Sequence, residues 1–91
     1  MDFSLALHEV IMKKEDSTPK SRKNALQEGF GKLVRKRRLE LGLSQEELAE
    51  RAKLHFTYVS SAERGERNIS LLNIQKLAEG LGCSMKDLMP K

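Results

Sequence analysis

Apolar residues recur at helical spacing through most of the chain, beginning near Ala25. A first helix is predicted from about Gln27 to Leu41, because apolar residues three or four positions apart share one side of a helix. The residues that carry this pattern are Phe30, Leu33, Val34 and Leu41. Gly42 follows in the position where a glycine commonly ends a helix.

Two short helices are predicted next, with a tight connection between them. The first starts at Ser44 and ends near Ala52, and Ser44 with Glu47 has the spacing of a capping box, in which each side chain accepts a hydrogen bond from a free backbone amide. The second runs from about His55 to Arg64 and is ended by Gly65. Such closely linked helices must meet at a sharp angle. Small residues suit the crossing, here Ala49 and Ala62.

A fourth helix is predicted after Ser70, which is placed to cap it, and Gly82 ends it. Its periodic apolar residues are Leu71, Ile74, Leu77, Ala78 and Leu81. A last turn or short helix from Ser84 to Asp87 brings in Leu88. Because no alternation of apolar and polar residues indicates a strand, we expect an all-α fold, a compact bundle of about five short helices containing a helix-turn-helix.

Residues 1–24 differ from the rest, so two units are expected: an N-terminal arm with a flexible linker (1–24) and a helical domain (25–91). The arm has a short apolar stretch that could be a helix or a strand, made of Phe3, Leu5, Leu7, Val10, Ile11 and Met12. Packing of this stretch on its own domain or on a dimer partner is the favoured interpretation, ahead of a dedicated binding function.

The charge of the chain favours a polyanionic partner. The net charge is +4 and the pI is about 9.4, with a dense basic run at Lys32, Arg35, Lys36, Arg37 and Arg38. Nucleic acid is the commonest such partner, although a solubilising surface accounts for the charge equally well.

Other functions find little support in the sequence. A single cysteine, Cys83, excludes an intrachain disulfide framework and a multi-cysteine metal site, and its position suits a small buried apolar residue. Neither a catalytic motif nor a metal or cofactor motif is found. Apolar runs are too short to cross a membrane. We therefore expect no enzyme activity, cofactor, metal, small-molecule ligand or membrane partner, and a cytoplasmic setting.

The run from Gly42 to Ala52 strongly resembles the Cro/C1 (XRE-type) helix-turn-helix family. The resemblance continues through Tyr58-Val59-Ser60, Glu63-Arg64-Gly65-Glu66-Arg67-Asn68, Ser70-Leu71 and Leu77-Ala78. It covers about Phe30 to Leu88 and implies a lambda-repressor-like fold. A narrower match is similar to restriction–modification controller proteins, in Leu54-His55, Thr57-Tyr58-Val59-Ser60 and the stretch from Glu63 to Asn68.

The resemblance implies that the helix at 55–64 lies in the major groove of double-stranded DNA. The matching base-facing positions are Phe56, Thr57 and Ser61, flanked by His55, Tyr58 and Ser60. For Tyr58, phosphate contact, base contact and packing all stay open. The positions expected to approach phosphate are Gln45, Arg35, Arg38, Arg64, Arg67 and Asn68. Arg38 and Glu63 match an ion pair that ties the first helix to the recognition helix.

Two residues depart from the family pattern. Lys53 stands where the turn usually has glycine, and a left-handed backbone there would cost about 1 kcal/mol. Phe56 stands where related sequences often have Arg or Gln. Phe cannot hydrogen-bond to a guanine edge, but it can pack on a thymine methyl group. DNA contact is favoured for Phe56, with domain packing as the alternative.

The resemblance also implies a homodimer on an inverted repeat, acting as a transcriptional regulator, for example a repressor. The expected dimer surface is an apolar patch at the C-terminal end, formed by Leu81, Met85, Leu88 and Met89. The N-terminal arm is the competing candidate for this surface. The alternative function is a protein-interaction module, such as an antitoxin whose N-terminal segment binds a partner protein.

Overall fold

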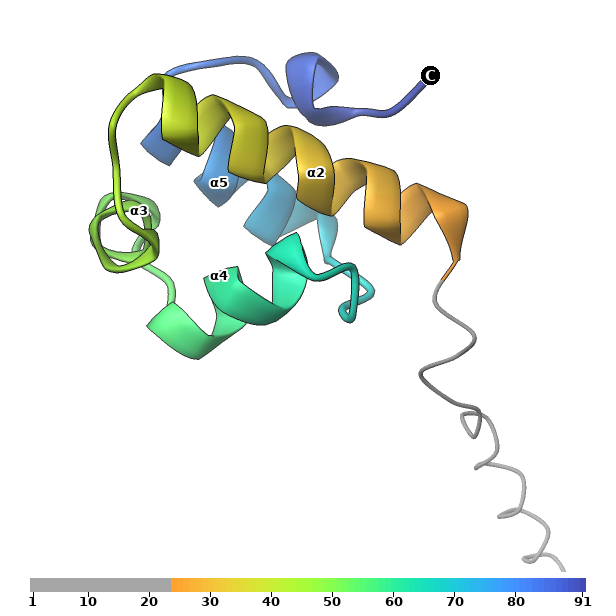
Figure 1. Cartoon of the computed structure of the whole chain (residues 1–91), viewed down its shortest axis with the longest axis horizontal. Helices are drawn as coiled ribbons and strands as arrows, with labels where there is room; N and C mark the ends of the chain where they lie inside the picture. The colour runs from red at the N-terminus through yellow and green to blue at the C-terminus, as the bar shows by residue number, and fades with distance from the viewer. Residues whose placement is uncertain (1–23) are drawn as a thin grey trace, which may run out of the picture.

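The structure is a computed structural model that describes residues 24–91. This part of the chain contains four α-helices and one 3-10 helix: α2 (Ala25–Glu40), α3 (Gln45–Ala52), α4 (Phe56–Glu63), α5 (Leu71–Leu81) and η2 (Met85–Leu88) (Figure 1). There is no strand among these residues, so the predicted all-α class is confirmed. Apart from Asn24, the predicted arm and linker lie outside the described residues. None of the helices described here is long and apolar enough to cross a membrane.

The predicted caps of α3 and α5 are present, whereas α2 begins two residues before the predicted Gln27 and is capped by Asn24. Ser44 Oγ accepts the backbone amide of Glu47 at 3.0 Å, and the Glu47 carboxylate accepts the backbone amide of Ser44 at 2.8 Å. The predicted capping box is therefore confirmed. Ser70 caps α5, and Gly82 ends that helix in the left-handed conformation. Lys53 is also left-handed, with φ of 59°, so the tight turn of the family is made here without glycine.

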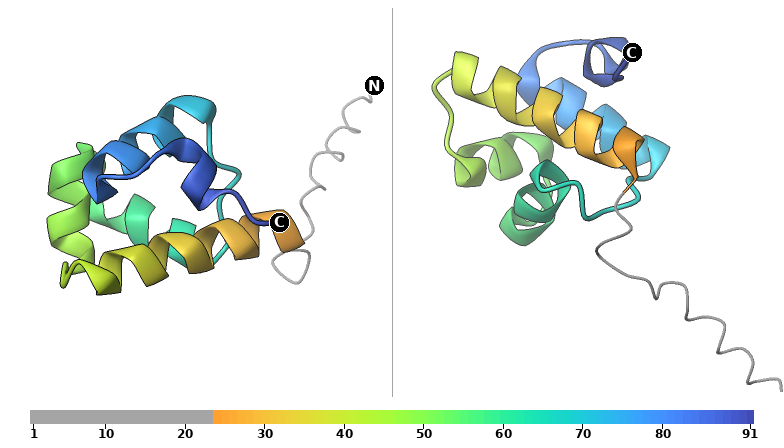
Figure 2. Two further views of the ribbon diagram at one scale, coloured as in Figure 1. Left: turned by 90° about the horizontal axis from the view of Figure 1, so that it is seen from above. Right: turned by 45° about the vertical axis from the view of Figure 1, so that its right-hand side comes forward.

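The core lies where α2, α3, α4 and α5 meet, and η2 closes it from the C-terminal side (Figures 1 and 2). Leucine and valine fill it, because large aromatic residues are scarce. The fully buried large side chains are Val34, Leu48, Val59, Leu77, Leu81 and Leu88. The residues predicted to face inward from α3 and α4 do so: Leu48, Ala49, Ala52, Val59 and Ala62.

Two residues predicted to line the core are exposed. The buried stripe of α2 continues from Val34 to Arg38 rather than to Leu41, which follows the end of the helix and is 39% exposed. Leu71 is the first residue of α5 and is 73% exposed, because the core does not extend to that end of the helix.

Helix α2 crosses α4 with the two backbones in contact. A Cβ atom at Gly31 would lie 2.5 Å from the carbonyl oxygen of Ala62 and 2.6 Å from that of Glu63. Only glycine allows this approach, since any side chain would push the helices apart. The recognition helix is thereby held directly against the longest helix of the domain. Periodicity alone did not indicate this role for Gly31.

Candidate nucleic-acid interface

Helix α4 packs on the core with one side and leaves the other side open, at the edge of the bundle away from η2 (Figure 1). Val59 and Ala62 are buried, whereas His55, Thr57 and Arg64 are exposed and Phe56 is 41% exposed. Ser60 and Tyr58 are half-buried. A short helix that is rigidly backed and exposed on its outer side can enter the major groove of DNA.

The N-terminus of α4 is capped by a histidine. His55 Nδ1 accepts the backbone amide of Thr57 at 3.2 Å and lies 2.8 Å from Thr57 Oγ1. When Nδ1 accepts both hydrogens, the proton of the neutral ring is on Nε2. The Thr57 hydroxyl group then keeps its acceptor lone pairs for another partner. His55 and Thr57 therefore form one ordered polar unit at the exposed start of the helix.

A buried ion pair joins α2 to the end of α4. Arg38 Nε and Nη2 donate to the two carboxylate oxygens of Glu63 at 2.7 and 3.0 Å, so the predicted pair is present. Arg38 Nη1 donates to the carbonyl oxygen of Leu43, and Gln45 Nε2 donates to Glu63. The hydrogen bond to Glu63 raises the pKa of Arg38, burial opposes it, and the charge of Glu63 adds to the rise.

This network changes the role expected of Arg38. The residue is 6% exposed and all three of its donor nitrogens are directed into the protein. The guanidinium is thus largely used within the domain, and an approach of Arg38 to phosphate stays a prediction. The Gln45 side chain is half-buried and bonded to Glu63, and its approach to phosphate stays a prediction.

Ser61, predicted to face the bases, is buried in the free protein, and its contact with DNA stays a prediction. It is 9% exposed and its hydroxyl group donates to the carbonyl oxygen of Tyr58 at 3.1 Å. Ser61 Oγ also accepts a hydrogen bond from Arg67 Nε at 2.7 Å. Ser60 is placed one position earlier and is less buried. The outer face of α4 therefore runs through Thr57, Ser60 and Arg64 rather than through Ser61.

The remaining positions predicted to approach phosphate lie at or near the surface. Arg64 is exposed. Its Nη1 donates a hydrogen bond to Ser60 Oγ at 2.6 Å, and its Nη2 forms an ion pair with the Glu66 carboxylate at 3.1 Å. Arg67 lies in the loop after α4, with its guanidinium 4.6 Å from the centre of the Tyr58 ring. Arg35 and Asn68 are exposed as well. Their contacts with DNA stay predictions.

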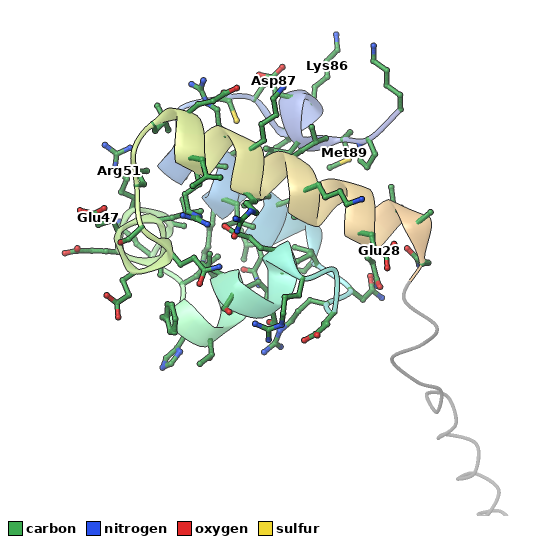
Figure 3. The ribbon with its side chains drawn as sticks, in the orientation of Figure 1. Glu28, Glu47, Arg51, Lys86, Asp87 and Met89 are labelled. Carbon is green, nitrogen blue, oxygen red and sulfur yellow. The ribbon has the colours of Figure 1, made fainter. Side chains whose placement is uncertain are left out.

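The predicted dimer surface is not an exposed patch. Leu81 and Leu88 are fully buried in the core of their own domain, and Met85 is packed against that core. Met89 alone of the four is exposed, at 39% (Figure 3). The leucines at the end of α5 and in η2 close the core and do not form a surface patch, whereas a dimer contact through Met85 and Met89 stays a prediction.

Neither a metal centre nor a reactive thiol is indicated in residues 24–91. No group of three His, Cys, Asp or Glu side chains there could hold a metal ion. Cys83 is half-buried against the core. Burial raises the pKa of its thiol, the charge of Asp87 adds to this, and the charge of Arg37 opposes it.

Comparison with known proteins places this geometry in a family. The helix-turn-helix family model matches residues 34–88. The chain is 51% identical over 61 residues to the control protein C.BamHI of Bacillus amyloliquefaciens, covering 66% of this chain and 75% of the relative. It is 45% identical over 60 residues to the control protein C.MunI of a Mycoplasma species, covering 65% and 81%.

Solved structures agree with this relationship. The restriction–modification controller protein C.AhdI from Aeromonas hydrophila has a TM-score of 0.67 and 45% identity, over 68% of this chain and 94% of that one. A Neisseria protein described as the hypothetical transcription factor NHTF has a TM-score of 0.70 and 40% identity, over 79% and 82%. The chain therefore belongs to the helix-turn-helix family of the Cro/C1 (XRE) type, and it is a DNA-binding regulator of transcription rather than an enzyme.

Proposed function

We propose that this protein is the controller of a restriction–modification operon and that it acts as a homodimer on an inverted-repeat operator. The relatives with control or controller in their names support this choice among regulators, because they share 45–51% identity over about two thirds of this chain. A regulator of this kind acts where the DNA is, in the cytoplasm. We propose that regulation depends on protein concentration and dimerisation.

Sequence readout is assigned to the exposed side of α4. The observation that carries this assignment is the buried Arg38–Glu63 pair together with the Gly31 crossing, since both hold α4 rigidly while Phe56 and Thr57 stay exposed at its start. Phe56 offers apolar contact to a thymine methyl group, and the Thr57 hydroxyl offers a hydrogen bond to a base edge. Arg64 and Asn68 flank this face and suit phosphate contacts.

The experiment is a selection from random duplex DNA, followed by titration of the selected duplex and of the DNA upstream of the protein's own gene. We expect a palindromic site, present in the upstream DNA, whose affinity falls as salt rises. Thr57→Ala should abolish most of the selectivity. Lys86→Ala is the matched control, because Lys86 lies in η2 on the opposite side of the domain from α4 (Figure 3).

Uniform, weak binding that Thr57→Ala does not change would contradict readout by α4. A selected site that is absent from the DNA around the gene would leave the regulator in place and contradict control of its own operon.

We assign the dimer contact to exposed leucines at the start of α2 and α5. Leu26, Leu71 and Leu72 are 61%, 73% and 60% exposed. A small apolar groove of about 90 Å³ lies at the same end of the molecule. Its apolar lining is Leu26, Phe30, Ile69, Ile74, Met89 and Pro90. Large leucines gathered on a surface indicate a contact with another molecule, and a second copy satisfies the two-fold symmetry of an inverted repeat.

Sedimentation tests this assignment directly. Leu72→Glu should yield a monomer, while a negative charge near the N-terminus of α5 is favourable for the helix itself. Leu39→Glu is the matched control, because Leu39 is 53% exposed near the other end of α2. A Leu72→Glu protein that still sediments as a dimer would move the contact elsewhere.

A further inference from the structure

Three residues around the end of α4 form a closed chain of contacts. The guanidinium of Arg67 lies over the ring of Tyr58, 4.6 Å from its centre. Arg67 Nε donates to Ser61 Oγ at 2.7 Å, and Ser61 Oγ donates to the carbonyl oxygen of Tyr58 at 3.1 Å. The loop residue Arg67 is thereby attached to the helix at two points, one polar and one aromatic.

We infer that Arg67 is a positioning residue that holds the Tyr58 ring in one orientation before DNA arrives, so that Tyr58 contributes to sequence selectivity. The inference rests on the proposed function, since it names how one residue of that DNA-binding face is prepared. It assigns to Arg67 a role beyond supplying positive charge, and it gives the buried Ser61 hydroxyl group a role as the acceptor for Arg67 Nε.

The geometry favours positioning because each contact restrains a different group. Ser61 is buried, and its hydroxyl group is directed by the Tyr58 carbonyl, so it is a fixed acceptor for Arg67 Nε. A guanidinium that is fixed at Nε presents its flat face to the ring, whereas a lysine ammonium has neither the planar shape nor this donor. Tyr58 is half-buried and would otherwise change rotamer in solvent.

The same arrangement leaves Arg67 able to meet the DNA backbone. Nε is used by Ser61, whereas the two terminal nitrogens of a guanidinium carry further donors. A phosphate bound there would add to the restraint on the ring. One side chain would then serve both selectivity and phosphate contact. Arg67→Lys separates the two roles, because it keeps the positive charge and loses the contacts to Tyr58 and Ser61.

The free protein provides the first test, because Tyr58 is the single tyrosine of the chain and there is no tryptophan. Tyrosine fluorescence of the full chain therefore reports on this ring alone. We expect Ser61→Ala and Arg67→Lys each to increase the fast component of anisotropy decay, and Lys86→Ala to leave it unchanged. Ser61→Ala suits a helix and removes only the hydroxyl group. Unchanged decay in both variants would overturn the positioning role.

DNA binding provides the second test. The ratio of affinities for the selected duplex and for random duplex should fall about two- to fivefold in Ser61→Ala and in Arg67→Lys, the range expected for a cation–π contact near the surface. The salt dependence should not change, because both variants keep the positive charge. In a Tyr58→Ala background, Ser61→Ala should cause no further loss.

A purely electrostatic Arg67 would give the opposite pattern, with an unchanged ratio in both charge-preserving variants, and would overturn the inference. Failure of the wild-type protein to select any duplex would contradict the proposed function instead. The fluorescence of the free protein distinguishes the two failures, because it needs no DNA.

Discussion

Replacement of Arg38 by methionine tests whether the buried ion pair holds the recognition helix in place. The Arg38 and Glu63 side chains are 8% and 3% exposed, and the substitution leaves the Glu63 carboxylate buried without its main partner. Breaking such a pair from one side costs about 3–5 kcal/mol. Because Gln45 still donates to Glu63, we expect about 3 kcal/mol, a large part of the stability of a small domain.

Urea unfolding followed by circular dichroism measures this cost, at one protein concentration for all variants. Removal of both charges in Arg38→Met/Glu63→Leu should cost less than Arg38→Met alone, since no unpaired charge then stays buried. Arg64→Met is the matched control. The Arg64–Glu66 pair is exposed, with side chains 55% and 35% accessible, and such pairs contribute about 1 kcal/mol or less.

Equal costs for Arg38→Met and Arg64→Met would refute the reasoning. So would a cost of Arg38→Met/Glu63→Leu equal to the sum of the costs of Arg38→Met and Glu63→Leu. Either result would mean that the pair is screened as if it lay in solvent. A second readout follows from the same geometry: Arg38→Met should lower the affinity for the selected duplex, because α4 loses its attachment to α2.

Three further predictions concern the local structure. Lys53→Gly should raise the free energy of unfolding by up to about 1 kcal/mol, because Lys53 has a φ of 59°; a lower melting temperature would contradict this. Ser44→Ala should cost about 1 kcal/mol through loss of the cap of α3, and an unchanged urea midpoint would show that the cap contributes nothing. Cys83 should react with iodoacetamide more slowly in the folded than in the unfolded protein, since burial raises the pKa of its thiol. Stability should accordingly fall as pH rises past the ordinary thiol pKa, and equal reaction rates would argue against this.

Local signals predicted the helices well. The caps at Ser44 and Ser70 and the end at Gly82 depend on residues within one turn of each other, and such short-range chemistry can be recognised in a sequence. The inward faces of α3 and α4 followed from spacing for the same reason. The match to the helix-turn-helix pattern also predicted how these helices are arranged relative to one another.

Spacing could not predict which periodic residues close the core and which reach the surface. Leu71 and Leu81 belong to the same stripe of α5, yet Leu81 is buried under η2 and Leu71 is exposed beyond the edge of the core. The prediction places Leu81 on a dimer surface and Leu71 along the core, whereas Leu81 is buried and Leu71 is exposed. The extent of the core along each helix depends on where the other helices end.

The sequence by itself determined the fold class, the position of the recognition helix and the Arg38–Glu63 pair, because helical periodicity, caps and a family pattern are properties of nearby or aligned residues. The tertiary structure alone decided how polar groups are shared. It buried the Arg38 guanidinium with its partner Glu63, buried Ser61, and brought Arg67 onto Tyr58. The Arg38–Glu63 pair joins residues 25 positions apart, and it spans the crossing of α2 and α4 that Gly31 permits.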